Sequence, residues 1–73
     1  MQLDSAVIEK VEFIHKYLFP LVKRADDRIS DLEYMRRNDN EFVIIKYRGG
    51  TNVAVCISRD NLITLARDVL KYI

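Results

Sequence analysis

Apolar residues recur at every third or fourth position along the first third of the chain. This spacing predicts an amphipathic helix whose core-facing stripe consists of Val7, Val11, Ile14, Leu18, Leu21 and Ala25. Asp4 or Ser5 is a suitable N-cap for this helix. Pro20 falls inside the pattern, and because proline lacks a backbone N–H and its ring clashes with the preceding turn, we predict a kink or a short break there.

Two apolar runs, residues 41–48 and 51–58, flank the pair Gly49-Gly50. They predict a β-hairpin with a two-residue loop, since paired glycines accept the positive φ angles of primed turns. Such a loop sets the register, with Ile44 opposite Val55 and Phe42 opposite Ile57 on one face. The other face then carries Val43, Ile45, Tyr47, Ala54 and Cys56 together with Asn52.

Residues 28–37 fit two patterns. The spacing of Ile29, Leu32 and Met35 is helical, whereas Leu32, Tyr34 and Arg36 alternate as in a strand. We favour the strand, because a two-stranded hairpin alone is a poor platform for two helices. A turn at residues 38–40 follows in either case.

A final amphipathic helix is predicted from the spacing of Leu62, Leu65, Ala66, Val69, Leu70 and Ile73, with Ser58 or Asp60 as its N-cap. The chain is therefore expected to form one α+β domain, residues 1–73, of order αβββα. This fold is an antiparallel three-stranded meander with N- and C-terminal helices. The alternative order, with residues 28–37 helical, is ααββα.

A chain of 73 residues buries only about 60 % of its unfolded surface, so its core is small. Domains of this size are commonly stabilised by disulfides, a metal or a partner chain. One cysteine and one histidine exclude an internal disulfide and fall short of a zinc ligand set. We accordingly expect no metal and no cofactor, and self-association remains as the third route.

The sequence offers little for catalysis. Cys56 and His15 could supply a nucleophile and a base, but Cys56 lies among apolar strand residues, where it is expected to be a small apolar filler. Asp26 and Asp27 resemble a solvated helix end beside basic residues. Gly49-Gly50 lacks the spacing of a phosphate-binding loop. We therefore predict that the protein is not an enzyme.

Twelve Lys and Arg against eleven Asp and Glu give a net charge of +1, so nucleic-acid binding would require a local patch. The candidate patch comprises Arg36, Arg37, Lys46 and Arg48, beside Tyr47. The predicted element order also resembles that of the double-stranded RNA-binding domain. That family has a lysine-rich start to its second helix, where this chain reads Arg59-Asp60-Asn61. A weak nucleic-acid-binding domain is thus the alternative hypothesis.

The apolar second face of the hairpin favours a protein interface. If both helices cover the face of Phe42 and Ile44, the residues left exposed are Val43, Ile45, Tyr47, Ala54 and Cys56. Soluble monomers rarely expose a contiguous patch of this kind. It would be covered by one of the helices, by a second copy in a homodimer or by another protein.

The arrangement of residues 41–73 supports a further expectation. A strand, a glycine turn, a Val-rich strand and an amphipathic helix opening with Ser58-Arg59-Asp60-Asn61 and ending with Arg67-Asp68-Val69-Leu70 resemble small phage and prophage proteins. The resemblance implies an inhibitor of a host protein that acts by stoichiometric binding. The sequence has no apolar run of about 20 residues, so no membrane span is expected, and we predict a location in the cytoplasm, that of the host if the protein is phage-derived.

Overall fold

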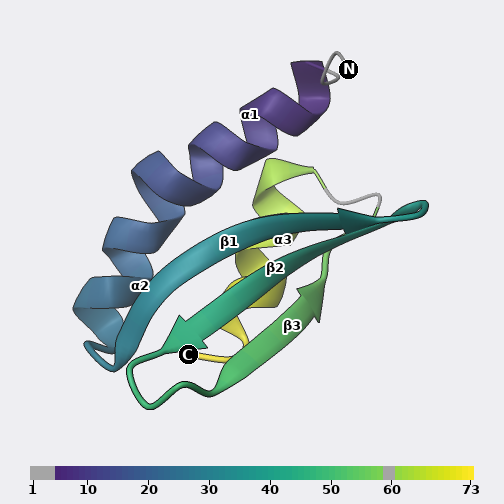
Figure 1. Cartoon of the computed structure of the whole chain (residues 1–73). Coiled ribbons are helices and arrows are strands. Elements are labelled where there is room, and N and C mark those ends of the chain that lie inside the picture. Colours follow the sequence, from purple (N-terminus) through teal and green to yellow (C-terminus); the bar gives the residue numbers. More distant parts are fainter. Residues whose placement is uncertain (1–4, 59–60) are drawn as a thin grey trace.

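The computed structural model describes residues 5–58 and 61–73. Its elements are α1 (Ser5–Phe13), η1 (Ile14–Leu18), α2 (Phe19–Ala25), β1 (Ile29–Arg37), β2 (Asn40–Tyr47), β3 (Asn52–Cys56) and α3 (Leu62–Leu70). The strands form one antiparallel sheet in the order β1-β2-β3 (Figure 1). Residues 28–37 thus contribute a strand, which confirms the αβββα meander and rules out the ααββα alternative.

Pro20 lies just after a π-helical turn, in a helix that runs without a break from α1 through η1 into α2. The backbone N–H of Phe19 donates to the carbonyl of Ile14, five residues earlier. A π turn holds one residue more than an α turn, which makes room for the proline ring beside the preceding carbonyls. The irregularity predicted at Pro20 is therefore a widened turn before the proline.

The widened turn also changes which residues of α2 face the core. Ile14, Leu18 and Val22, each four residues after the last, are all buried, whereas Leu21 is 54 % exposed. The predicted stripe is correct up to Leu18 and wrong for Leu21 and Ala25, because the extra residue moves the buried position one residue along the chain.

The ambiguous spacing in β1 has a physical cause. Ile29 and Leu32 are both fully buried although they are three residues apart, since the register shifts between Ile29 and Asp31 at a β-bulge. The bulge adds one residue to β1, so Leu32 points to the same face of the sheet as Ile29. After it, the strand alternates regularly and Met35 is exposed.

The β2–β3 hairpin has a three-residue loop, Arg48-Gly49-Gly50, where two residues were predicted. The N–H of Tyr47 donates to the carbonyl of Thr51 (2.9 Å), and the N–H of Gly50 donates to the carbonyl of Tyr47 (3.0 Å). Phe42 consequently pairs with Cys56, and Val43 with Val55. The predicted register is wrong by one residue, because Arg48 belongs to the loop and not to the strand.

The loop geometry predicts different effects for its two glycines. Only Gly50 has a positive φ (+89°), and a Cβ at either glycine would meet no atom within 4 Å. We expect Gly50→Ala to lower the free energy of unfolding by about 1 kcal/mol through backbone strain alone. Gly49→Ala should be neutral or slightly stabilising, because it only restricts the unfolded chain. Urea denaturation of both variants tests this, and equal losses would argue against the three-residue loop.

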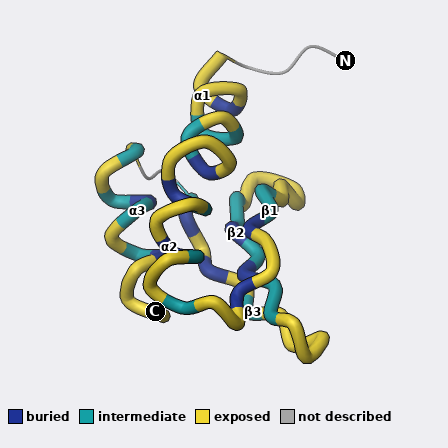
Figure 2. The backbone as a smooth tube through the Cα atoms, turned by 90° about the vertical axis from the view of Figure 1, so that its left-hand side faces the viewer, coloured by how far each residue is buried: buried dark blue, intermediate teal, exposed yellow. Residues whose placement is uncertain are grey.

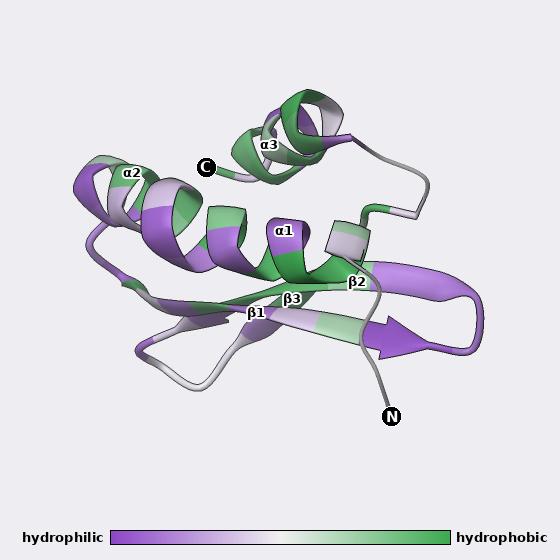
Figure 3. Ribbon diagram, turned by 90° about the horizontal axis from the view of Figure 1, so that it is seen from above, coloured by the Kyte–Doolittle hydropathy of each residue, from purple (hydrophilic) through white to green (hydrophobic). Residues whose placement is uncertain are grey.

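All described helices lie on one face of the sheet, and no described element covers the opposite face (Figure 3). Buried positions concentrate between the helices and the strands (Figure 2). The cluster at the centre of this core comprises Ile14, Leu18, Val22, Ile29, Leu32, Val43, Ile45, Val55, Ile57, Leu65 and Val69.

The last helix is capped differently from the prediction. Asn61 is the N-cap of α3, with its side chain accepting from the N–H of Thr64 while the Thr64 hydroxyl accepts from the N–H of Asn61. The hydroxyl of Ser58 instead accepts from the N–H of Glu41 at 2.9 Å. The other predicted caps, Asp60 and Asp4, lie outside the described residues. Ser5 is the first described residue of α1.

Candidate functional site

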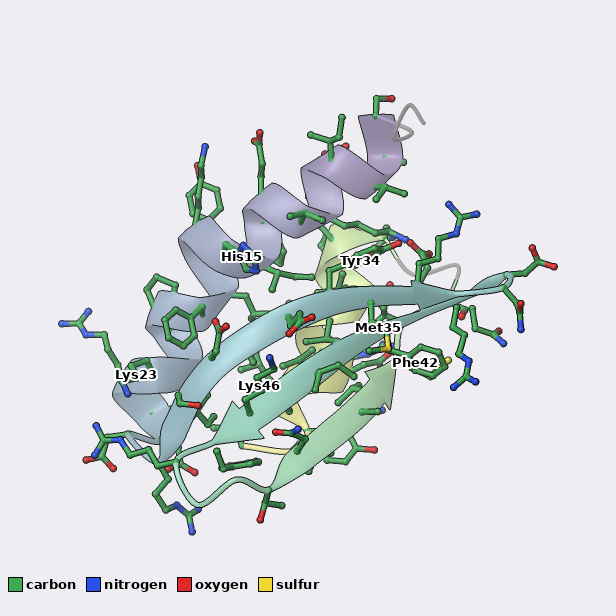
Figure 4. The ribbon with its side chains drawn as sticks, viewed as in Figure 1. His15, Lys23, Tyr34, Met35, Phe42 and Lys46 are labelled. Carbon is green, nitrogen blue, oxygen red and sulfur yellow. The ribbon has the colours of Figure 1, made fainter. Side chains whose placement is uncertain are left out.

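The side of the sheet that no described helix covers, here called the open face, presents every second side chain of the three strands. Its described members are Asp31, Glu33, Met35, Arg37, Asn40, Phe42, Ile44, Lys46, Asn52, Ala54 and Cys56. Figure 4 views this face, with Met35 and Phe42 close together at one end of the sheet and Lys46 farther along. No helix of the described ranges covers it.

One half of the open face is apolar. Met35 pairs with Phe42, which pairs with Cys56 on the far strand, and Ile44 pairs with Ala54 in the next row. Met35 is 42 % exposed, Ala54 and Cys56 are exposed, and Phe42 and Ile44 are half-buried by their neighbours. We call Met35, Phe42, Ile44, Ala54 and Cys56 the apolar patch.

Charged residues of both signs border the apolar patch. Lys46 forms an ion pair with Glu33 across the two strands, and this hydrogen bond lowers the pKa of Glu33 and raises that of Lys46. Asp31 lies beside Lys46 in the register, and Arg37 lies at the opposite end of β1. The border therefore has no excess of positive charge.

The predicted interface residues do not share a face. Val43 and Ile45 are fully buried beneath the helices, and Tyr47 packs against the same core. Ala54 and Cys56 lie on the open face. The set is divided because a one-residue change of register exchanges the faces of all β3 side chains relative to β2.

The open face could have been recognised from β1. Asp31, Glu33 and Arg37 alternate with Leu32 and Tyr34, so one side of this strand is strongly polar. A tight turn at Asn38-Asp39 pairs that side with the even-numbered residues of β2. Pairing the first two strands therefore assigns Phe42 and Ile44 to solvent, whereas the hairpin alone leaves both faces equivalent.

Cys56 and His15 are not brought together. The thiol of Cys56 is exposed on β3, 3.6 Å from the Ser58 hydroxyl, so the residue does not act as a packed apolar filler. His15 lies against β1, where its Nε2 donates to the carbonyl of Leu32 at 3.1 Å. The two outer strands are about 10 Å apart across β2, too far for a thiol–imidazole hydrogen bond. Among the described residues, no group of three His, Cys, Asp or Glu side chains could hold a metal ion.

The four basic residues singled out in the sequence are divided between the two ends of the sheet. Arg36 and Arg37 end β1, whereas Lys46 is the second-last residue of β2 at the other end of the sheet and Arg48 lies in the loop beyond it. Arg36 and Arg37 also point to opposite faces by strand alternation. The structure therefore does not form one basic patch from them.

A shallow pocket of about 480 Å³ lies beside the β2–β3 loop, lined by Arg28, Tyr47, Arg48, Gly49, Thr51 and Val53. The guanidinium of Arg28 is engaged by the carboxylate of Asp26, with contacts of 3.0 and 2.8 Å. These hydrogen bonds lower the pKa of Asp26 to about 2. The pair closes the turn between α2 and β1, and the side chain of Asp26 is only 16 % exposed. The predicted solvated helix end is therefore correct for the exposed Asp27 but not for Asp26.

A polar cluster that the sequence did not indicate joins α1 to the sheet. The carboxylate of Glu41 accepts from Lys10 Nζ at 2.8 Å and from the hydroxyl of Tyr34. The side chains of Lys10 and Glu41 are only 12 % and 14 % exposed. Residues 31 positions apart in sequence meet here, so no local pattern could have revealed the contact. Its packing between elements indicates a structural role.

Comparison of the chain with protein-family models, curated proteins and solved structures gives no match. None of the described helices has both the length and the apolar character needed to span a bilayer.

Proposed function

We propose that this protein is a non-catalytic binding protein that acts by stoichiometric contact with a protein partner through the open face. The observation that carries the proposal is the apolar patch with its charged border. An exposed cluster with an aromatic residue and a methionine at its centre and charges at its rim has the anatomy of a protein–protein interface.

The charges of the open face favour a protein over a nucleic acid. Phosphate binding needs several unpaired cations along one surface. On this face Lys46 is paired with Glu33, and Asp31 adds a further negative charge beside it. A protein surface with an apolar centre and charges of both signs is the complementary partner.

The mechanism that follows is steric. The sheet is held on its other side by a fully buried core, so Phe42 and Met35 are presented on a rigid surface that needs little ordering on binding. Occupying the surface of an enzyme would inhibit it, which is the role implied by the resemblance to small phage proteins. In that setting the partner belongs to the host and the protein acts in the host cytoplasm.

Photo-crosslinking tests the proposal. A photo-reactive amino acid at position 42 is expected to join one partner protein in extracts of the source or host cell, at one partner per chain. The same residue at position 63, where Ile63 is 80 % exposed on α3, serves as the matched control and should join none. Added wild-type protein should abolish the crosslink, whereas added Phe42→Asp protein should not.

Three results would contradict the proposal. These are equal crosslinking at positions 42 and 63, no crosslink at position 42, and a crosslink at position 42 only to a second copy of the chain. Binding of the protein to nucleic acid that is lost at high salt would instead support the nucleic-acid alternative, since added salt weakens phosphate contacts far more than an apolar interface.

A further inference from the structure

The two outer edges of the sheet differ in the hydrogen bonds that their outward backbone groups make. At the β1 edge, His15 Nε2 donates to the carbonyl of Leu32 (3.1 Å) and Lys23 Nζ donates to the carbonyl of Ile29 (2.9 Å). The N–H of Leu32 donates to its neighbour Asp31 at 2.8 Å. Figure 4 shows His15 and Lys23 reaching the strand from the N-terminal helix. Side chains thus occupy the outward N–H and carbonyl of Leu32 and the carbonyl of Ile29, which another strand would need in order to pair along this part of β1.

The β3 edge has no such protection in the described part of the chain. The N–H of Tyr47 bonds to Thr51, and the N–H of Ile57 bonds to Glu41, so odd-numbered residues of β3 pair with β2. By strand alternation, Asn52, Ala54 and Cys56 direct their N–H and C=O groups outward. No described element lies beside this edge (Figure 1).

The sequence of β3 also lacks the residues that usually prevent an edge strand from pairing with another strand. Residues 51–58 contain no charged residue and no proline. Natural edge strands are commonly blunted by Lys, by Pro, by a bulge or by a covering element. The β1 edge has a bulge and a covering helix, whereas β3 has a regular register throughout. This difference between the two edges leaves β3 available for pairing with another strand.

We propose that β3 pairs with β3 of a second copy, antiparallel about a twofold axis at Ala54, to form a continuous six-stranded sheet. Ala54 then lies opposite Ala54 of the second copy, and Asn52 lies opposite Cys56 of the second copy. This register satisfies all the outward groups of the three residues with about six main-chain hydrogen bonds. A shift by two residues in either direction leaves one of the three without a partner.

The residues of β3 are compatible with pairing between two copies of this strand. The two residues at the twofold axis are small, and no charge is placed opposite a like charge. On the helix side, half-buried Val53 would lie next to Val55 of the second copy and become buried. The twofold axis is normal to the sheet, so both open faces lie on the same side and the two apolar patches form one larger surface.

Cysteine crosslinking tests the register. In a chain carrying Cys56→Ser, the further change Ala54→Cys is expected to give a disulfide-linked dimer under mild oxidation. Opposed residues in a hydrogen-bonded pair have Cα atoms about 5.5 Å apart, within the range of disulfides. The matched control, Asn52→Cys in the same Cys56→Ser chain, faces serine and should remain uncrosslinked. Asn52→Cys with native Cys56 should crosslink. Failure at position 54, or equal crosslinking in all three proteins, overturns the proposal.

Light scattering over a concentration series, at low and at high salt, tests the dimer itself. Wild type is expected to be a dimer, and its dissociation constant should change less than about twofold between the two salt concentrations. Ala54→Lys should be monomeric with an unchanged circular dichroism spectrum, because the exposed side chain has no role in the core and two lysines would meet at the axis. Ile63→Lys is the matched control and should stay dimeric.

One further variant separates this inference from the proposed function. Phe42→Asp disrupts the apolar patch but lies away from the β3 edge, so it should remain dimeric even where partner binding is lost. A monomeric wild type, or a dimer abolished by Phe42→Asp and kept by Ala54→Lys, overturns the edge pairing. Neither of these results bears on whether the open face binds a protein.

Discussion

Ile45→Lys is expected to prevent folding. Ile45 is fully buried at the centre of β2, beneath the helices, and contributes to the main core cluster. The substitution removes a large apolar side chain and places an ammonium group where it has no partner, which costs about 4 kcal/mol or more. A domain of this size has a total stability of about 4 to 11 kcal/mol. Circular dichroism and urea denaturation should show a largely unfolded chain.

The neighbouring substitution Ile44→Lys is the matched control. Ile44 lies one position earlier on the same strand but faces the open side, where the ammonium group can reach water. We expect a loss of about 1 kcal/mol or less and a folded protein. If Ile45→Lys folded and Ile44→Lys did not, the assignment of the two sheet faces would be reversed.

Glu41→Ala is expected to lower the free energy of unfolding by about 2 kcal/mol, since it leaves the ammonium of the largely buried Lys10 side chain without its carboxylate. The hydroxyl of Tyr34 loses its acceptor in the same change. Glu12→Ala is the matched control, because Glu12 is exposed and pairs with Lys16 only at 3.9 Å. It should cost less than about 0.5 kcal/mol. Equal effects in urea denaturation would show that the cluster does not brace α1 against the sheet.

The same cluster makes the stability depend on pH in a defined direction. Burial raises the pKa of Glu41, but the hydrogen bonds from Lys10 and Tyr34 outweigh it and the pKa is lowered below 4.5. The folded state therefore binds fewer protons than the unfolded state, and this part of the stability is present above about pH 4.5 and lost as the pH falls further. In Glu41→Gln this acid-dependent part should be absent.

Tyr34 acts at the other end of the pH scale. Burial and the hydrogen bond to Glu41 raise its pKa to about 12. A pKa raised by folding favours the protonated folded state, so its contribution is complete below pH 10 and declines as the pH rises towards 12. Tyr34→Phe should flatten this decline, and an unchanged alkaline limb would argue against the enclosed hydroxyl.

The two proposed surfaces would reinforce each other. Pairing through β3 places two open faces side by side, so a dimer presents two apolar patches to one side of the sheet. A partner with two matching sites would then bind more tightly through the raised effective concentration of the second contact.

Local patterns in the sequence determined the elements and their order. The spacing of Leu62, Leu65 and Val69 specifies a helix by itself, and the alternation in residues 41–48 specifies a strand, because both periods follow from backbone geometry. The need for a third strand to support two helices resolved residues 28–37. The irregularity near Pro20 was also predictable, since it follows from the missing N–H.

The pairing of the strands in the tertiary structure, and not the pattern within β2 or β3, decided which faces are buried. Val43 and Ile44 are equally apolar, and only the polar side of β1, carried across to β2 by pairing, leaves Ile44 facing solvent and Val43 beneath the helices. One extra residue in the β2–β3 loop exchanged the faces to which the β3 side chains point. One extra residue in the π turn moved the buried position of α2 one residue along the chain. Two contacts join residues that are distant in sequence, the ion pair of Lys10 with Glu41 and the hydrogen bond from His15 to the β1 edge. They form only once the helix has packed against the sheet.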